Sequence, residues 1–435
     1  MNLIQKIAQF QRIHGTRKLI FEIASRVRRR GQAALGILPA PPKDAGWVDA
    51  TSFLQSQWPQ RTALRVFETP RRAQPRLNLV TDSINADSLY GGVGTAIILA
   101  CELARHRGAS LRVVTRTQPA EPANLYNLLA TFGLAAPAGV EFAFAPFDGG
   151  RWELDVSPDE LFLTTSWWTT DATLRSVPHT SVLYLLQEDE RMFYPMGDEH
   201  LLCSRILGHP ELRFAVNSRL LFDHLVSSGL DNVRRNALAF EPAFPSQVYY
   251  PRPAAAAQTR RTLAFYARPY NARNLFHFGV ELLEAAIARG VLSLDDWDIV
   301  FFGKHIPDIR LDGGRYAPRR LENLEWRDYA AFVGTVDLGL CLMYTPHPSY
   351  PPFDMSASGA VVVTNRFANK QDLTPYCANI LCGDPHLDSM LDALGRGIAL
   401  AKDDPTRAEN YRQRRLPRDW TTALADVVSR YGRGA

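Results

Sequence analysis

The chain has 435 residues, of which 46% are hydrophobic and 22% charged, a composition typical of a soluble globular protein with room for two domains. A formal net charge of +4 at pH 7 is too small to indicate nucleic-acid binding. The five cysteines form no CxxC pair and show no metal-ligand spacing, so we expect reduced thiols, no metal and a cytoplasmic protein. We also expect neither a membrane span nor a secretion signal.

The first 31 residues are strongly basic, with eight Lys or Arg and one Glu, and their apolar residues recur with helical spacing. Two interpretations remain open. A basic amphipathic helix can lie on an anionic membrane, here the inner face of the cell membrane, or it can dock on its own domain with a solvated basic side. Residues 32–70 show little internal pattern. We therefore treat residues 1–70 as a helical extension and connector.

From residue 76 apolar strand patterns alternate with helix patterns, which predicts parallel, doubly wound α/β sheets. The alternation is interrupted by a proline- and alanine-rich stretch at 240–261 and then resumes. We predict a first Rossmann-like domain at 71–245, a second at 246–415 and a last helix at 416–435. The expected strands are 76–83, 110–117, 140–147, 159–168, 179–190, 212–217, 262–269, 297–303, 338–343 and 360–365, and the expected helices include 94–108, 122–134, 218–229 and 274–290.

Three glycines, Gly91, Gly92 and Gly94, stand between the first predicted strand and its helix. Exposed amides at a helix N-terminus suit an anion or a sugar held close to the backbone, although a plain tight turn also explains such glycines. No Gly-Lys-Ser/Thr follows, so the turn is not a Walker loop. Ile97 occupies the place of the third glycine of a dinucleotide fingerprint, which disfavours NAD.

The second half carries basic residues where a ligand is expected. Arg268 ends an apolar strand in "FYARPYNARNLF", and Arg273 follows five residues later at the start of a helix. Two guanidiniums beside a helix N-terminus suit a diphosphate. The alternative is a pair of solvated surface arginines.

The segment "TPHPSYPPFDMSASGAVVVTN" places Asp354 near the first turn of a helix. A carboxylate there can accept hydrogen bonds from ribose hydroxyls, or it can simply cap the helix. His347 and Ser349 precede it and can face the same cleft, although a surface or core histidine is an equally simple interpretation.

Polar residues also follow strands of the first half. Asp82 and Asn85 flank the glycine turn and can orient an acceptor hydroxyl. Gln187, Glu188 and Asp189 follow another buried strand. Asp82, Glu188 or Asp189 can serve as a base if the reaction inverts an anomeric centre, whereas a retaining front-face reaction needs no base.

In order, these motifs resemble those of the retaining GT-B glycosyltransferases, in which an Arg-x4-Lys pair grips the donor diphosphate and a Glu holds the ribose. The stretches "VTDSIN…LYGGVGTAIILA", "YLLQEDE…FYP", "FYARPYNARNLF" and "HPSYPPFDMSASGAVVVTN" are similar to the WsaF-type rhamnosyltransferases of bacterial surface polysaccharides. This similarity runs in collinear order from about residue 75 to residue 420.

The resemblance implies a GT-B fold of two Rossmann-like domains facing a cleft, a dTDP-β-L-rhamnose donor, a lipid-linked or oligosaccharide acceptor, retention and no metal. Arg268 falls on the family arginine, Arg273 on the lysine and Asp354 on the ribose-binding Glu. Two residues depart from the family pattern. Pro346 stands where the first Glu of the usual pair belongs, and the second Glu is shortened to Asp354. A non-catalytic GT-B-like binding component therefore remains the alternative to an active transferase.

Overall fold

A computed structural model describes residues 49–86, 88, 91–147, 152–252 and 260–432 of the chain. The chain divides into a small unit that ends at Pro59 and a large unit that begins at Gln60. In the small unit Asp49 caps helix α2 (Ala50–Gln57) by accepting a hydrogen bond from a backbone amide of its first turn. The basic segment 1–31 lies outside the described residues. Among the helices that are described, none combines the length and apolar character needed to cross a bilayer.

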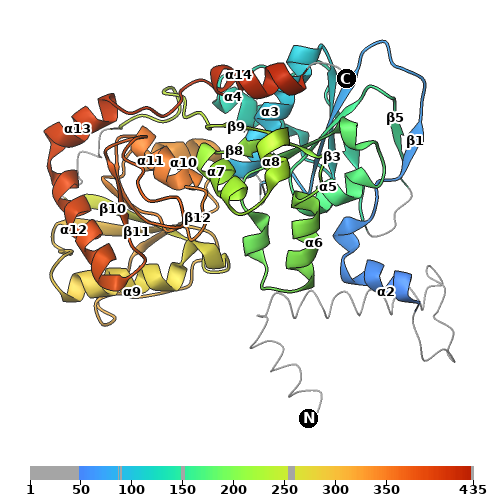
Figure 1. Cartoon of the computed structure of the whole chain (residues 1–435). Helices are drawn as coiled ribbons and strands as arrows, with labels where there is room; N and C mark the ends of the chain where they lie inside the picture. Colours follow the sequence, from blue (N-terminus) through green and yellow to red (C-terminus); the bar gives the residue numbers. More distant parts are fainter. Residues whose placement is uncertain (1–48, 87, 89–90, 148–151, 253–259, 433–435) are drawn as a thin grey trace. The chain divides into compact units, whose positions relative to one another are not determined.

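The large unit contains two parallel sheets, coloured blue to green and yellow to red in Figure 1. The first has seven strands in the order β4-β3-β2-β6-β7-β8-β9, and the second has six in the order β12-β11-β10-β13-β14-β15. Each order reverses once, between β2 and β6 and between β10 and β13, which is the doubly wound arrangement that the alternating sequence predicts. The strands are β2 Arg76–Thr81, β3 Ser110–Thr115, β4 Glu141–Phe144, β6 Leu161–Thr164, β7 Val182–Leu186, β8 Arg213–Asn217, β9 Ala237–Phe240, β10 Arg261–Ala267, β11 Trp297–Gly303, β12 Arg319–Glu322, β13 Leu338–Leu340, β14 Val361–Asn365 and β15 Ile380–Gly383.

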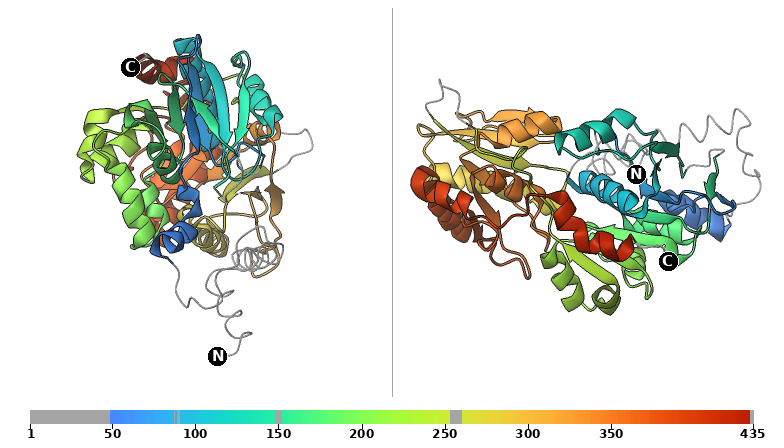
Figure 2. Two further views of the ribbon diagram at one scale, coloured as in Figure 1. Left: turned by 90° about the vertical axis from the view of Figure 1, so that its right-hand side faces the viewer. Right: turned by 90° about the horizontal axis from the view of Figure 1, so that it is seen from above.

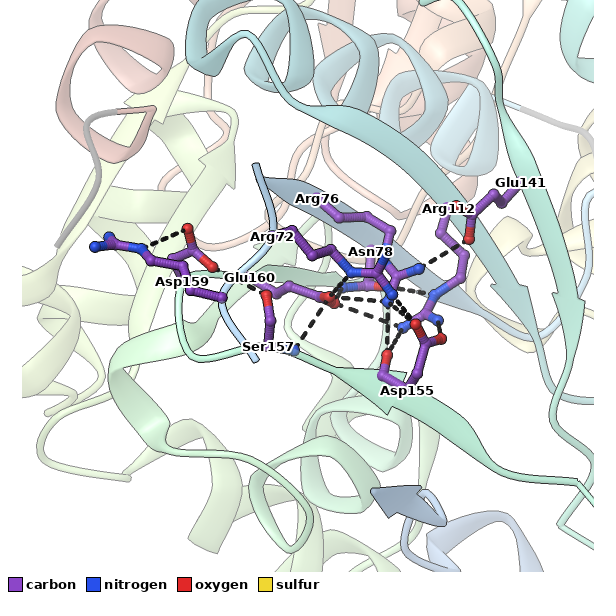
Figure 3. Close-up of polar contacts among 10 residues, drawn as sticks. Arg72, Arg76, Asn78, Arg112, Glu141, Asp155, Ser157, Asp159 and Glu160 are labelled. Carbon is purple, nitrogen blue, oxygen red and sulfur yellow. Dashed lines mark hydrogen bonds and ion pairs between the residues drawn. The ribbon is translucent and has the colours of Figure 1, made fainter. Parts of the chain in front are cut away.

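Helices cover both faces of each sheet, so central strands such as β2 and β7 are buried along their whole length. In the second sheet α9 and α12 pack on one face and α10 and α11 on the other, as the views in Figures 1 and 2 show. Strand β7 is a continuous apolar run, whereas β2 carries Arg76 and Asn78, which lie in a buried network of hydrogen bonds and ion pairs (Figure 3). The helices are α3 Gly91–Arg107, α4 Pro122–Thr131, α5 Trp167–Leu174, α6 Asp198–Leu207, α7 Arg219–Ser227, α8 Asp231–Asn236, α9 Phe276–Ala288, α10 Trp326–Val333, α11 Tyr350–Ala357, α12 Leu387–Lys402, α13 Asp404–Arg412 and α14 Trp420–Tyr431.

Several local features differ from the sequence expectation. Trp167 and Trp168, expected at the end of a strand, open helix α5, and β12 and β15 were not among the expected strands. Helix α3 begins at Gly91, so the three glycines lie in its first turn, and their predicted place between strand and helix is wrong. Part of the expected connector is regular structure, because Val66–Glu68 forms strand β1, which pairs in parallel with β5 (Leu154–Val156). Both segments are only three residues long, and such short strands carry little periodic signal.

One apolar cluster runs through both Rossmann-like domains. Phe132 of the first domain packs edge-on against Trp326 of the second and against Trp420 of the last helix. Helix α14 packs on α3 and β9 of the first domain, so the end of the chain returns there after the second domain is complete. The Tyr431 hydroxyl near its end donates to the Asn236 carbonyl at 2.8 Å.

Two helix-interior glycines give a matched test of how tightly the helices of the second domain pack. A Cβ added at Gly279 in α9 would lie 2.3 Å from Cζ of Phe265, whereas one at Gly395 in α12 would meet Val291 at an ordinary 3.7 Å. Alanine improves helix propensity by about 1 kcal/mol at either site. We expect Gly395→Ala to raise the free energy of unfolding and Gly279→Ala to lower it by about 1–3 kcal/mol through overpacking. Urea denaturation measures both, and equal signs would contradict the packing described.

Candidate active site

A cavity of about 240 Å³ opens at the carboxyl ends of strands from both sheets. Ligands of open parallel sheets bind at such edges, because loops there converge where the strand order reverses. Residues after β7, β10, β11 and β13 contribute to its wall, together with the starts of α3 and α11. The lining comprises Gly91, Gly92, Gln187, Glu188, Tyr266, Arg268, Asn271, Arg273, Asn274, Phe302, Gly303, Lys304, Leu321, Leu324, Trp326, Tyr329, Met343, His347, Ser349, Tyr350, Pro351 and Asp354.

Two guanidiniums, together with Lys304, contribute positive charge to the lining of this cavity. Arg268 follows β10, and its Nη1 donates to the Tyr266 hydroxyl at 3.2 Å. The Arg273 guanidinium carbon lies 4.3 Å from the centre of the Phe193 ring, and its buried Nε has no hydrogen-bond partner among the described residues. Burial, and to a smaller extent the charge of Arg268, lowers the pKa of Arg273 from its ordinary value. An anion between Arg268 and Arg273 would offset the repulsion between the two guanidiniums and the cost of burying the charge of Arg273.

Glu188 is the carboxyl group that the first domain contributes to the cavity, and Asp354 is the one from the second domain. The side chain of Glu188 is buried, which raises its pKa to about 7 despite the nearby positive charges of Arg273 and Lys370. Oε1 lies 3.8 Å from Nδ1 of His347, and Oε2 accepts no hydrogen bond from any residue that the structure describes. A buried carboxyl group titrating near neutrality at a cavity wall is suited to proton transfer.

His347 presents a neutral imidazole that can donate a hydrogen bond from Nε2. Its Nδ1 accepts a hydrogen bond from the Ser349 amide at 3.0 Å, which places the proton on Nε2. Burial, together with the charges of Lys370 and Arg273, lowers the pKa of His347 to about 3. The Nε2 atom is buried and has no hydrogen-bond partner within the described part of the chain, and His347 belongs to the lining of the cavity. Ser349 itself adopts a φ of 71°, a costly conformation for a side-chain-bearing residue that is common at ligand sites.

Asp354 lies at the start of the second turn of α11, directly after a first turn formed by Tyr350, two prolines and Phe353, close to the place that we expected. Its Oδ2 accepts a hydrogen bond from the Tyr329 hydroxyl at 2.7 Å, and Tyr249 contributes a second one. Burial outweighs both hydrogen bonds and raises the pKa of Asp354 to about 7. The two tyrosines thus orient a carboxyl group in the lining of the cavity.

Tyr350 joins the two Rossmann-like domains beside the cavity, a role that the sequence did not reveal. A Cβ on Gly91 would lie 2.5 Å from Cδ2 of the Tyr350 ring, so the packing of this ring by itself requires a glycine there. The Tyr350 hydroxyl shares a hydrogen bond with Thr95, accepts one from Asn217 at 2.6 Å and donates one to Gln187 at 3.2 Å. Gln187 in turn donates to the Gly92 carbonyl at 2.8 Å.

Three residues expected at the site do not line this cavity. The carboxylate of Asp82 accepts hydrogen bonds from the Trp168 indole at 2.9 and 3.1 Å, and burial raises its pKa. Asn85 donates to the Pro119 carbonyl and so ties the loop after β2 to the start of α4. Asp189 binds Arg191 through both carboxylate oxygens, which helps to hold its pKa at about 2.

Two family models match the chain, one over each Rossmann-like domain. The model of the WsaF N-terminal domain matches residues 76–218, and that of the WsaF C-terminal domain matches residues 261–395, so together they span more than half of the chain. The chain belongs to the WsaF family. The WsaF motifs recognised in the sequence thus coincide with the segments that surround the cavity.

A curated relative and several solved structures are similar to this WsaF-family chain. It is 28% identical over 353 residues to the O-antigen biosynthesis protein RfbC of Myxococcus xanthus, a match that covers 78% of the chain but spans only 26% of that relative. HepE of Anabaena, solved with UDP and glucose, superposes with a TM-score of 0.58 at 11% identity over 82% of this chain and 100% of its own. WaaG, a glycosyltransferase involved in lipopolysaccharide biosynthesis, superposes with a TM-score of 0.56 at 10% identity. The match covers 82% of this chain and 99% of the WaaG chain. These likenesses confirm the GT-B fold.

The raised pKa of Asp354 predicts a pH-dependent stability. Between about pH 4 and pH 7 the folded protein keeps a proton on Asp354 that the unfolded chain releases. The stabilising contribution of this proton to the free energy of unfolding is therefore fully present below pH 4 and is lost as pH rises through 7. Asp354→Asn removes the titration and keeps the shape. We expect the variant's stability relative to the wild type to rise by about 1.4 kcal/mol per pH unit across this range. Urea denaturation at pH 5, 6 and 7 measures it, and a constant difference would contradict it.

Proposed function

We propose that this WsaF-family protein is a glycosyltransferase that moves a sugar from a nucleoside diphosphate onto a growing bacterial surface polysaccharide. The observation that carries this function is the pair Arg268 and Arg273, which line one cavity at the carboxyl ends of the strands of a GT-B fold. Glycosyl transfer needs a stabilised diphosphate leaving group, and two guanidiniums in a water-poor site supply that charge. No divalent metal is required for this step.

The remaining residues of the cavity can bind the other parts of the donor. The oriented carboxyl group of Asp354 would accept hydrogen bonds from the ribose hydroxyls, as the family pattern implies. The Nε2–H of His347 would donate to a phosphate or sugar oxygen. The backbone of Ser349, Gly91 and Gly92 lies at the same wall and allows a close approach of the donor.

Glu188 is our candidate for the carboxylate that acts during the reaction. The usual first Glu is replaced by Pro346 in the second domain, whereas Glu188 reaches the cavity from the first domain. In a retaining front-face transfer the leaving phosphate takes the acceptor proton, and a carboxylate near the sugar stabilises the developing positive charge. In an inverting transfer Glu188 would itself accept that proton. The family resemblance favours retention.

The donor that we propose is dTDP-β-L-rhamnose, because the sequence motifs are those of the WsaF-type rhamnosyltransferases. Another nucleotide sugar is the alternative, since a structure of HepE holds UDP-glucose. We propose a lipid-linked or oligosaccharide acceptor, in line with the O-antigen role named for the relative RfbC. Residues 1–31 would then hold a cytoplasmic enzyme peripherally on the inner face of the membrane where such an acceptor lies.

A non-catalytic nucleotide- or glycan-binding component of a polysaccharide assembly complex is the second candidate. The absence of the first Glu at position 346 favours it. Such a component would bind the nucleotide without turnover, so the two candidates separate in an assay that follows both.

Binding of nucleotide tests the diphosphate site. We expect TDP to bind more tightly than UDP or GDP without metal, and Arg268→Ala to weaken TDP binding by about 100-fold, because a charge-assisted bidentate contact is lost. Arg315→Ala is the matched control, since Arg315 is 78% exposed in the same domain. Isothermal titration calorimetry with EDTA and then with Mn²⁺ makes the measurement. Unchanged TDP affinity in Arg268→Ala would remove the diphosphate assignment.

Turnover tests the role of Glu188. With dTDP-β-L-rhamnose and an oligosaccharide acceptor, we expect Glu188→Gln to lower kcat by about 100-fold and to change TDP affinity only a few-fold. Asp82→Asn is the matched control, because that carboxylate is held by Trp168 away from the cavity lining, and it should keep most activity. Equal losses in the two variants would contradict the choice of Glu188. The anomeric configuration of the product, read by NMR, distinguishes retention from inversion.

A further inference from the structure

Lys370 carries a buried positive charge directly behind the wall of the candidate active site. Its side chain is fully buried, although lysine is among the residues that proteins bury least often. The ammonium group donates a hydrogen bond of 2.6 Å to the backbone carbonyl of Met343, a residue that lines the cavity. Lys370 itself does not belong to the lining, so one residue of the wall separates its charge from the cavity.

The charge of Lys370 is not neutralised where it lies. No carboxylate of the described residues forms an ion pair with its ammonium group, and the Met343 carbonyl that it contacts is neutral. Burial lowers the pKa of Lys370 to about 8, and the charge of Glu188 offsets only part of this effect, so the side chain is still mainly protonated at pH 7. A buried charge of this kind lowers the stability of the folded state unless an anion offsets it.

The backbone beside the ammonium group also holds the diphosphate-binding segment. Tyr344, the residue after Met343, donates its amide hydrogen to the carbonyl of Arg273 at 2.7 Å. Met343 and Arg273 both line the cavity. A short stretch of the wall therefore connects the charge of Lys370 to the place where a diphosphate would lie.

The position of this wall does not depend on Lys370 alone. The side chain of Asn365 accepts a hydrogen bond from the Met343 amide at 2.7 Å and donates one to the Met343 carbonyl at 3.1 Å. Phe367 and Lys370 exchange backbone hydrogen bonds of 3.0 and 2.8 Å, so the turn that carries the lysine is closed by its backbone. A neutral side chain at position 370 would thus remove the charge and leave both the wall and the turn held.

We propose that the ammonium group of Lys370 is a further positive charge that stabilises the leaving diphosphate from behind the wall formed by Met343. This inference rests on the proposed transferase function. When the bond between the anomeric carbon and the β-phosphate oxygen breaks, its electron pair stays on that oxygen, and the diphosphate gains one negative charge. The acceptor oxygen forms the new bond to the anomeric carbon, and its proton passes to the leaving phosphate or to Glu188.

The effect of Lys370 should grow as the reaction proceeds. Little water separates the ammonium group from the cavity, so its charge is weakly screened and acts beyond contact distance. The bound donor has one negative charge fewer than the diphosphate that leaves. Lys370 therefore stabilises the transition state and the product more than the bound donor, which affects kcat and TDP affinity more than the KM of the donor.

Two neutral variants of the full chain, Lys370→Met and Lys370→Gln, test this role. We expect each to weaken TDP binding by about tenfold in calorimetry, and to lower kcat with dTDP-β-L-rhamnose by about tenfold, because the charge is lost. The KM for the donor should change by about threefold or less. Lys402→Met is the matched control, because it removes the same charge from an exposed ion pair with Asp296 and should leave all three constants unchanged.

Urea denaturation without nucleotide separates this role from a purely structural one. We expect Lys370→Met to unfold at the same urea concentration as the wild type or at a higher one, because an unpaired buried charge is removed while Asn365 still holds Met343. Asn365→Ala should instead unfold at a lower urea concentration and raise the KM of the donor, because the wall itself loses its support.

The possible results lead to different conclusions. Wild-type TDP affinity and kcat in a folded neutral variant would overturn the inference. A lower urea midpoint with unchanged TDP affinity, or failure of both neutral variants to fold, would also overturn it, because Lys370 would then serve the fold alone. If the wild type itself neither binds TDP, UDP or GDP nor transfers a sugar, the proposed function is refuted and this inference falls with it.

Discussion

The ring of Tyr350 against Gly91 is the contact on which the rest of the site depends. Only a glycine allows this approach, and the Tyr350 hydroxyl then reaches three side chains of the first domain. Tyr350 is also the first residue of α11, so the segment that joins the domains carries His347 and Ser349 before it and Asp354 behind it. The contact between the domains and one wall of the cavity are therefore built from one stretch of chain.

Charge buried at this joint gives the cavity its chemistry. Glu188 comes from the first domain and Arg273 from the second, while Lys370, whose pKa falls to about 8 because of burial, stands close to Glu188. Water screens such charges poorly, so each shifts the protonation of the others. An arriving diphosphate would add negative charge beside Arg273 and raise the proton affinity of Glu188. In the proposed reaction, donor binding and proton transfer would be electrostatically coupled through these groups.

Much of the candidate site could be predicted from the sequence. The residues that were wrongly expected there share one physical reason. Arg268, Arg273 and Asp354 were found because each stands at the end of a strand or in a helix that a parallel sheet directs to one edge. Asp82 and Asp189 satisfy the same rule but turn to Trp168 and Arg191. A residue's place after a strand predicts the edge it reaches, but local pairing decides which way its side chain points.

By itself the sequence determined the two doubly wound domains, their order and the family, because buried parallel strands read as apolar runs and the WsaF motifs are collinear. It also located the basic pair. Only the tertiary structure decided that Glu188, and not Asp82 or Asp189, reaches the cavity from the first domain, and that Gly91 makes room for the ring of Tyr350. Those facts join residues more than a hundred positions apart, and no periodicity in one chain records which distant side chains packing brings together.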